Sequence, residues 1–210
     1  IDENSDEITI SVNAEEQKKE EKTITIEVED KELDMLKAEI VSAYLNNYTT
    51  IEIISKKLLT NAVEIKEILR NLAGLEVMEQ TSTRIVVKDL ININDISIEN
   101  IIRRIDIIVR GMIDDCIKCI YGEDHYESIF QRDFDVNRLY YLVTRVIKNA
   151  LKNPRVAKLF NKNPYQLSNE ELVIIRLEKI ADRQKRIARA LRGAVMRKET
   201  LKELEQLFQN

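Results

Sequence analysis

Residues 131–140 read QRDFDVNRLY and lie in a segment, 123–153, that contains neither glycine nor proline. A helix turning about 100° per residue gives this segment an apolar stripe formed by Ile129, Val136, Tyr140, Val143, Ile147 and Ala150. Asp133 falls in the middle of that stripe, and Asn137 lies one turn further along its edge. A carboxylate in the centre of an apolar face is costly unless another group pairs with it. The partner of Asp133 is therefore the first question about function.

The composition favours a mostly helical protein. The 210 residues include 4 glycines, 2 prolines and no tryptophan, and 33% of them are charged. The net charge of −4 gives no general attraction to nucleic acid or to an anionic membrane. No uninterrupted apolar run reaches about 18 residues, and no signal peptide is present, so we expect no membrane insertion. The chain lacks an initiator Met and starts in mid-pattern, so we expect a processed, truncated or partly observed chain.

The two cysteines have the spacing of a C-x-x-C motif, but their context does not fit metal or redox chemistry. Cys116 and Cys119 fall inside a helical pattern, and the chain has 1 histidine. A zinc site would need more ligands, and a redox motif expects a turn between a strand and a helix. We interpret both cysteines as reduced core thiols, which is typical of a cytoplasmic protein.

The N-terminal region is expected to hold two short strands. Residues 8–12 and 23–28 alternate between apolar and polar side chains, and a solvated charged run, 15–22, separates them. Two isolated strands do not form a stable sheet. We therefore expect their partners to lie upstream or in a second chain.

Residues 31–90 predict a small α+β unit. Helices are expected at 31–45 and 61–72, and a hairpin is expected from the strands 75–79 and 84–87. Gly74 is a plausible stop for the second helix. The outline is weakly similar to a winged helix-turn-helix, but the second helix mixes acidic and basic side chains rather than presenting a basic face. A packing and dimerisation subdomain is favoured, and DNA contact is the alternative.

Residues 91–210 predict an antiparallel helical bundle. The expected helices are 97–121, 123–152, 168–192 and the start of a further helix at 198–208, with one helical turn at 156–160. Asp95 or Ser97 could cap the first of them. Pro164 is expected to close the short turn, and Ser168 with Glu171 has the form of a capping box for the next long helix.

Two pairs of oxygen ligands suggest a metal site inside this bundle. Glu178 and Asp182 share one side of a helix, with roughly 5–6 Å between their Cβ atoms, and Asp133 and Asn137 have the same spacing. If the two helices are antiparallel neighbours, the pairs can converge on Mg²⁺, Mn²⁺, Ca²⁺ or iron. The alternative is ordinary ion pairing with nearby basic residues. The candidates are Arg132, Arg138, Lys179, Arg183, Lys185 and Arg186.

Residues 131–140 and 177–188 (LEKIADRQKRIA) resemble the two acidic helix motifs of PhoU-type phosphate-uptake regulators. Upstream, residues 72–77 (LAGLEV) and 84–90 (RIVVKDL) are similar to an archaeal branch in which an AbrB-like domain precedes the PhoU bundle. The resemblance implies a mainly α protein, with a PhoU-like antiparallel bundle behind a small α+β unit with a hairpin. The bundle would hold one three-helix repeat and part of a further helix.

The domains expected from this resemblance are residues 1–30, a remnant of the AbrB-like end with a charged linker, residues 31–90, the α+β unit, and residues 91–210, the bundle. The family implies a cytoplasmic, non-enzymatic regulator of phosphate uptake that acts by protein contact. Its partner would be a phosphate ABC transporter or a signalling protein, and a homodimer is expected.

The resemblance also implies a ligand set for a divalent metal or iron. Carried across by position, the ligands are Asp133, Glu178 and Asp182, while Asn137 stands where the family usually has Asp. An amide oxygen can bind a cation but brings no charge, so the first motif is weakened.

A transcription regulator and an enzyme are the two alternative functions. A transcription regulator would bind DNA through an AbrB-like or winged-helix-like N-terminal region, but the basic front half of an AbrB-like unit is not present in this chain. An enzyme is poorly supported, because His125 reads as a surface histidine at the start of a helix, and neither a Gly-rich phosphate loop nor a nucleophile–histidine set has a usable context.

Overall fold

The computed structural model describes residues 21–29, 31–56 and 62–192 of the chain. The first part contains β1 Thr23–Glu27, α1 Leu33–Leu45, β2 Thr50–Ile54, α2 Ala62–Arg70, β3 Leu75–Gln80 and β4 Arg84–Asp89. After a short 3₁₀ turn, Ile93–Asp95, come α3 Ile98–Ile120, α4 Tyr126–Lys152, α5 Pro154–Leu159 and α6 Pro164–Leu191. The strand predicted at 8–12 and the helix predicted at 198–208 lie outside the described residues.

The four strands form one mixed sheet in the order β1-β2-β4-β3. β1 runs parallel to β2, with Ile24 opposite Ile51, and the other pairs are antiparallel. The expectation that the 23–28 strand needs a partner from outside the chain is therefore wrong. The partner, β2, was not predicted as a strand. A parallel pair needs a crossover connection, and α1 supplies it.

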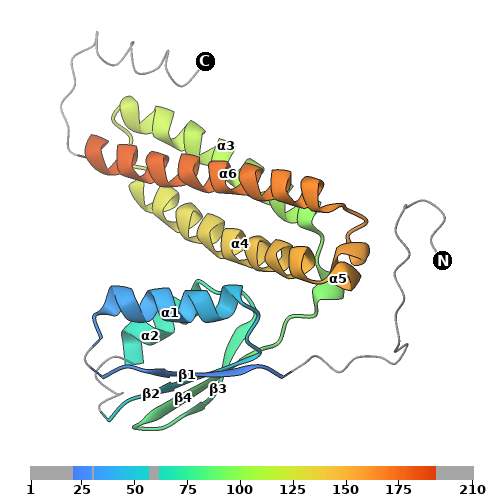
Figure 1. The fold of residues 1–210 in the computed structure, drawn as a ribbon. Helices are drawn as coiled ribbons and strands as arrows, with labels where there is room; N and C mark the ends of the chain where they lie inside the picture. The colour runs from blue at the N-terminus through green and yellow to red at the C-terminus, as the bar shows by residue number, and fades with distance from the viewer. Residues whose placement is uncertain (1–20, 30, 57–61, 193–210) are drawn as a thin grey trace, which may run out of the picture.

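Helices α1 and α2 cover one face of this sheet (Figure 1). Their buried side chains, which include Ile40 and Tyr44, pack on Ile51, Ile53 and Ile85 from the strands. The predicted helices and the predicted hairpin are confirmed, with boundaries shifted by a few residues. Gly74 precedes β3 with a φ of 80°, a conformation that glycine adopts at little cost.

Helices α3, α4 and α6 form the bundle (Figure 1). Each helix contributes one apolar face to a common core, which contains Ile105, Met112, Val136, Ile147 and Ile174. Ser97 caps α3 by accepting a hydrogen bond from the Asn100 N–H. The predicted fold class, a mainly helical bundle preceded by a small α+β unit, is confirmed.

The start of α6 corrects one prediction. Asn163 is the N-cap and forms the capping box with Gln166, while Pro164 occupies the first turn. Ser168 lies inside the helix rather than at its cap, so the predicted Ser168–Glu171 box is wrong. Proline suits the first helical position because its missing N–H would have no partner there. Pro164 therefore begins a helix instead of closing the preceding turn.

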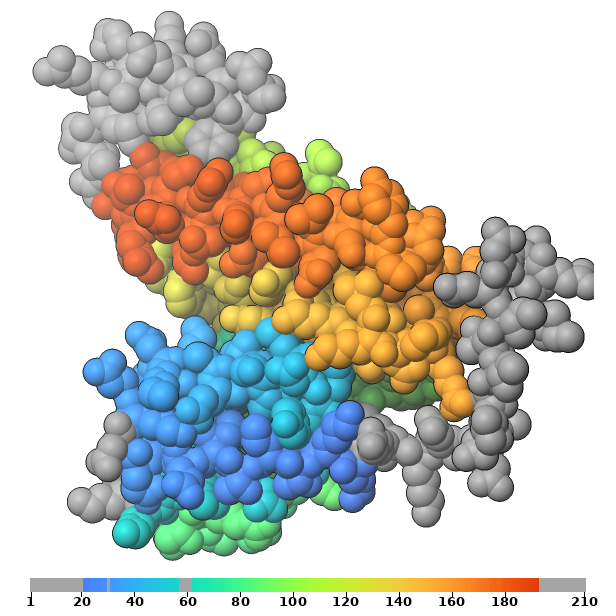
Figure 2. Space-filling model, in the orientation of Figure 1, coloured from blue at the N-terminus to red at the C-terminus, as the bar shows by residue number. Residues whose placement is uncertain are grey.

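The α+β unit packs directly on the bundle. Figure 2 shows α1 (blue) in contact with α4 (yellow). Arg145 of α4 donates hydrogen bonds to Asp89 at 2.6 Å and to Asn47 at 3.1 Å. The same guanidinium carbon lies 4.5 Å from the centre of the Tyr44 ring. Among the described residues, no helix is both long and apolar enough to cross a membrane.

Candidate functional site

Asp133 is buried in the bundle, as its place on the apolar stripe predicted. The Lys185 ammonium of α6 lies 2.6 Å from its Oδ2 atom. Asn137, one turn along α4, donates a hydrogen bond to the same oxygen at 3.2 Å. A buried carboxylate needs this kind of compensation. The partner of Asp133 is therefore a lysine on the neighbouring helix, one of six basic residues that the sequence offered.

Lys185 links both halves of the predicted metal site. Its Nζ atom also lies 3.3 Å from Asp182 Oδ1, within α6. Burial opposes the charge on Lys185, but the hydrogen bonds to Asp133 and Asp182 outweigh it and raise the pKa of the amine. Lys185 is thus a positive charge held between carboxylates from two helices.

Glu178 is the least compensated carboxylate of this group. Burial raises its pKa, and the negative charges of Asp182 and Asp133 raise it further. Lys179 and Lys185 act in the opposite direction without reversing the shift. Glu178 is therefore held beside two other carboxylates in a partly buried position, where its charged form is disfavoured.

We call Asp133, Asn137, Glu178, Asp182 and Lys185 the polar seam. The structure thus places the predicted ligands around one seam between α4 and α6. Its centre holds an ammonium, and no group of three or more His, Cys, Asp or Glu side chains within the described residues is arranged to hold a metal. Metal binding at these positions stays a prediction.

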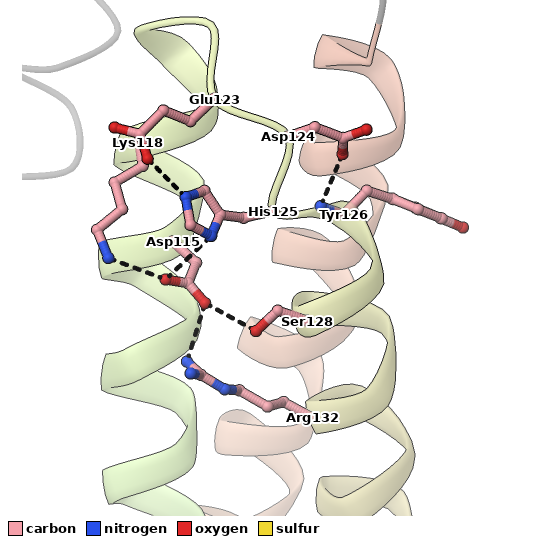
Figure 3. Close-up of polar contacts among 8 residues, drawn as sticks. All are labelled: Asp115, Lys118, Glu123, Asp124, His125, Tyr126, Ser128 and Arg132. Carbon is pink, nitrogen blue, oxygen red and sulfur yellow. Dashed lines mark hydrogen bonds and ion pairs between the residues drawn. The ribbon is translucent and has the colours of Figure 1, made fainter.

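A second polar cluster, which was not predicted from the sequence, lies at the turn between α3 and α4 (Figure 3). Asp115 is buried on α3, accepts a hydrogen bond from Ser128 Oγ at 3.0 Å, and lies 3.2 Å from Arg132 Nη1. Lys118 Nζ lies 3.3 Å away, and His125 Nδ1 lies at 3.8 Å. In the sequence, this cluster is indicated only by Asp115, an acidic residue beside the apolar stripe of α3.

The shift at Asp115 is opposite to that at Glu178. Burial alone would raise the pKa of Asp115, but hydrogen bonds from Ser128 and Lys118 and the Arg132 charge lower it below the ordinary value. His125, expected as a surface residue, lies partly buried between Asp115 and Glu123, with 2.8 Å from its Nε2 atom to Glu123 Oε2. The turn is thus held by compensated charges.

Two consecutive residues of α4 tie it to both neighbours. Arg132 faces Asp115 of α3, while Asp133 faces Lys185 of α6. Cys116 is buried beside this cluster and its Sγ lies 3.4 Å from the Gln184 carbonyl. Burial raises the pKa of the Cys116 thiol to about 12, so the thiolate needed for reaction is scarce at neutral pH. Both cysteines are free.

Comparison with known families gives one result. A family model described as PhoU domain matches residues 102–191, which run from the first turns of α3 to the end of α6. Neither a curated protein nor a solved structure significantly matches the chain. The resemblance to PhoU-type motifs is confirmed over this range. The archaeal branch and the AbrB-like domain are not supported by the match and stay predictions.

Proposed function

Because residues 102–191 form a PhoU domain, we propose that this protein regulates phosphate uptake by binding another protein. The partner class is a phosphate ABC transporter or a signalling protein that acts on it. The observation that carries this proposal is that the matched range covers α4 and α6 in full and α3 from residue 102 onward. PhoU domains are typically non-enzymatic, which agrees with a regulator that works through contact.

The exposed side of α6 is the part of the bundle best suited to such contact. Tyr165 with Leu172, and Val173 with Ile180, repeat at a spacing of seven residues, and all four side chains are exposed. This spacing places them on adjacent rows of one helix face. Exposed apolar side chains gathered on one face mark a protein contact more often than isolated ones do. We call these four residues the α6 face.

Introducing negative charge on the α6 face tests the proposal. In cells of the source organism that lack the gene, we expect deregulated uptake of radiolabelled phosphate, restored to normal by the wild-type protein. The Leu172→Glu, Val173→Glu double variant should fail to restore it, because two carboxylates cannot be buried in an apolar interface without cost. Ile107→Glu on α3, where the side chain is also exposed, is the matched control and should restore regulation.

Two outcomes would contradict the proposal. Unchanged phosphate uptake in the deletion strain would remove the regulatory role itself. Full activity of the double variant would remove the α6 face from the contact. The expected homodimer is measured on the same proteins by light scattering. A wild-type dimer that the double variant converts to monomer would assign the α6 face to a second copy of the chain.

Metal binding at the polar seam is part of the proposal and depends on Lys185. A divalent cation or iron bound by Asp133, Asn137, Glu178 and Asp182 has to displace the ammonium, which lies 2.6 Å from Asp133. Two cations cannot share one carboxylate cluster at close range without strong repulsion. The metal and Lys185 are therefore competitors for the same oxygens.

Helix α2 of the α+β unit gives little support to DNA binding. Helix α2 carries Glu64 and Glu67 beside Lys66 and Arg70. Such a mixed face gives little attraction to phosphates. The transcription-regulator alternative therefore stays a prediction that involves the N-terminal region.

A further inference from the structure

The outer side of α6 carries a row of exposed basic side chains, spaced three or four residues apart. This spacing keeps them on one side of the helix, opposite the buried Ile174 and Ala181. At 1.5 Å per residue the row is about 20 Å long. Figure 2 shows α6 (orange to red) at the surface of the bundle. We call this row the basic stripe, and its members are Arg176, Lys179, Arg183, Arg186 and Arg189.

The basic stripe concentrates charge of one sign. Within the part of the chain that the structure describes, no carboxylate forms an ion pair with its four arginines, and Lys179 acts on Glu178 only through its electric field. Asp182 pairs instead with Lys185. Arg192, which follows the stripe, does have a carboxylate neighbour in Asp124. A surface with one sign of charge attracts a partner of the opposite sign, although the net charge of the whole chain is −4.

A row of apolar side chains runs beside the basic stripe. Val173, Ile180 and Ile187 repeat every seven residues, which is close to two helical turns. Val173 is 46% exposed and Ile180 is 39% exposed. Cations beside apolar groups suit the boundary of a lipid bilayer, where charged headgroups lie next to acyl chains. A nucleic acid would use the cations for its phosphates and leave the apolar row in water.

We propose that the basic stripe binds the surface of a membrane that contains anionic phospholipids. Clusters of four to eight Lys and Arg residues on an amphipathic helix have this property, and each such residue strengthens binding by roughly fivefold. The helix would lie on the membrane rather than enter it, because its opposite face is part of the bundle core. The inference does not rest on the role in phosphate uptake, because lipid binding is measured on the purified protein.

The basic stripe extends beyond the α6 face defined above. Val173 and Ile180 belong to both surfaces, so a protein bound there would compete with the bilayer for these two side chains. Arg183, Arg186 and Arg189 lie past the last residue of the α6 face. Variants at these arginines therefore test the lipid contact separately from the protein contact.

The test is co-sedimentation of the full chain with phosphatidylcholine vesicles that either contain or lack phosphatidylglycerol. We expect binding only when phosphatidylglycerol is present, and added salt should weaken it because exposed charges are screened. Arg183→Gln with Arg186→Gln should weaken binding at least tenfold. Lys66→Gln with Arg70→Gln removes the same charge from exposed positions of α2. This control pair should bind as the wild type does.

Circular dichroism checks the folding of each variant. Arg176→Gln with Lys179→Gln is a second pair on the basic stripe, which should weaken binding similarly and replaces the first pair if that one does not fold. Absence of wild-type binding to the anionic vesicles at low salt would overturn the proposal. Unchanged binding by the stripe variants, or equal weakening by the α2 control pair, would do the same. Tighter binding to duplex DNA, lost in the stripe variants, would assign the stripe to nucleic acid instead.

Discussion

The Arg145–Asp89 pair and the Lys185–Asp133 pair have the same 2.6 Å separation, yet their surroundings differ. The first lies between the α+β unit and the bundle, with side chains that are 6% and 1% exposed. The second lies inside the bundle, where Lys185 is 19% exposed. Arg145 is also held by Asn47 and lies against the Tyr44 ring, whereas Lys185 is shared with Asp182.

The two ion pairs therefore differ in how many other groups compete for the positively charged side chain. Arg145 pairs with the buried carboxylate of Asp89 and with the neutral Asn47, so its loss removes the guanidinium that balances the Asp89 charge. Lys185 lies among several carboxylates, one of which, Glu178, has a raised pKa. A cation that entered this cluster would compete with Lys185 for the same oxygens. The interface pair therefore links the two units, while the Lys185 pair lies within a cluster of several carboxylates.

The largest expected effect is that of Arg145→Met. Removing one partner from a buried ion pair typically costs about 3–5 kcal/mol, because the other charge is left uncompensated. Asp89, whose side chain is 1% exposed, would lose its ion-pair partner, and the Ile91 N–H that donates to its Oδ1 atom carries no charge to replace it. Urea denaturation should show this loss in the free energy of unfolding. The Arg145→Met, Asp89→Leu double variant should recover much of the lost free energy of unfolding. If Arg145→Met alone lost less than about 1 kcal/mol, the pair would contribute no more than a surface ion pair does.

Lys185→Met should have an intermediate effect on stability and a distinct effect on metal binding. Asp133 keeps the Asn137 hydrogen bond, so we expect a loss of about 1–3 kcal/mol. Elemental analysis after incubation with Mn²⁺ should show more bound metal in Lys185→Met than in the wild type, because the oxygens are released. Arg189→Met, at an exposed basic residue further along the same helix, is the control and should change neither quantity.

The same measurement tests the predicted ligands. Glu178→Ala with Asp182→Ala should abolish the Mn²⁺ that binds to Lys185→Met and any that binds to the wild type. Metal content that is equal with and without these two carboxylates would show that the polar seam is not a metal site, and that Lys185 and Asp133 form an ordinary ion pair.

The smallest effect is expected from Glu178→Gln, and its sign is opposite. The folded-state pKa of Glu178 is raised above 4.5, so its contribution to stability is present below pH 4.5 and is lost as pH rises through the folded-state pKa. Glutamine cannot ionise. The variant should therefore be more stable than the wild type near about pH 7, by less than about 1 kcal/mol, with little difference near about pH 4.

Denaturation curves at these two pH values check the prediction. Asp115→Asn is the contrasting variant, since the pKa of Asp115 is lowered from 3.8. Its carboxylate stabilises the fold above that value and loses this contribution as pH falls through the folded-state pKa. A Glu178→Gln variant that is less stable than the wild type at neutral pH would show that the seam needs this negative charge.

Local patterns were enough to predict the helices, the hairpin and the burial of Asp133. Helical periodicity and turn residues are properties of neighbouring positions, so a single sequence displays them. The same patterns brought Asp133, Asn137, Glu178 and Asp182 together as candidates. They failed at α6, where two alternative caps lay a few residues apart and the proline was read as a stop.

The tertiary structure decided which charges meet. Lys185 is 52 residues from Asp133, and Arg145 is 56 residues from Asp89. Such pairs depend on how helices are rotated and shifted against each other, which periodicity within one helix does not specify. The partner of β1 was hidden for the same reason, because parallel strands are joined by a crossover. The sequence by itself determined that a buried carboxylate needed a partner, and packing selected the lysine.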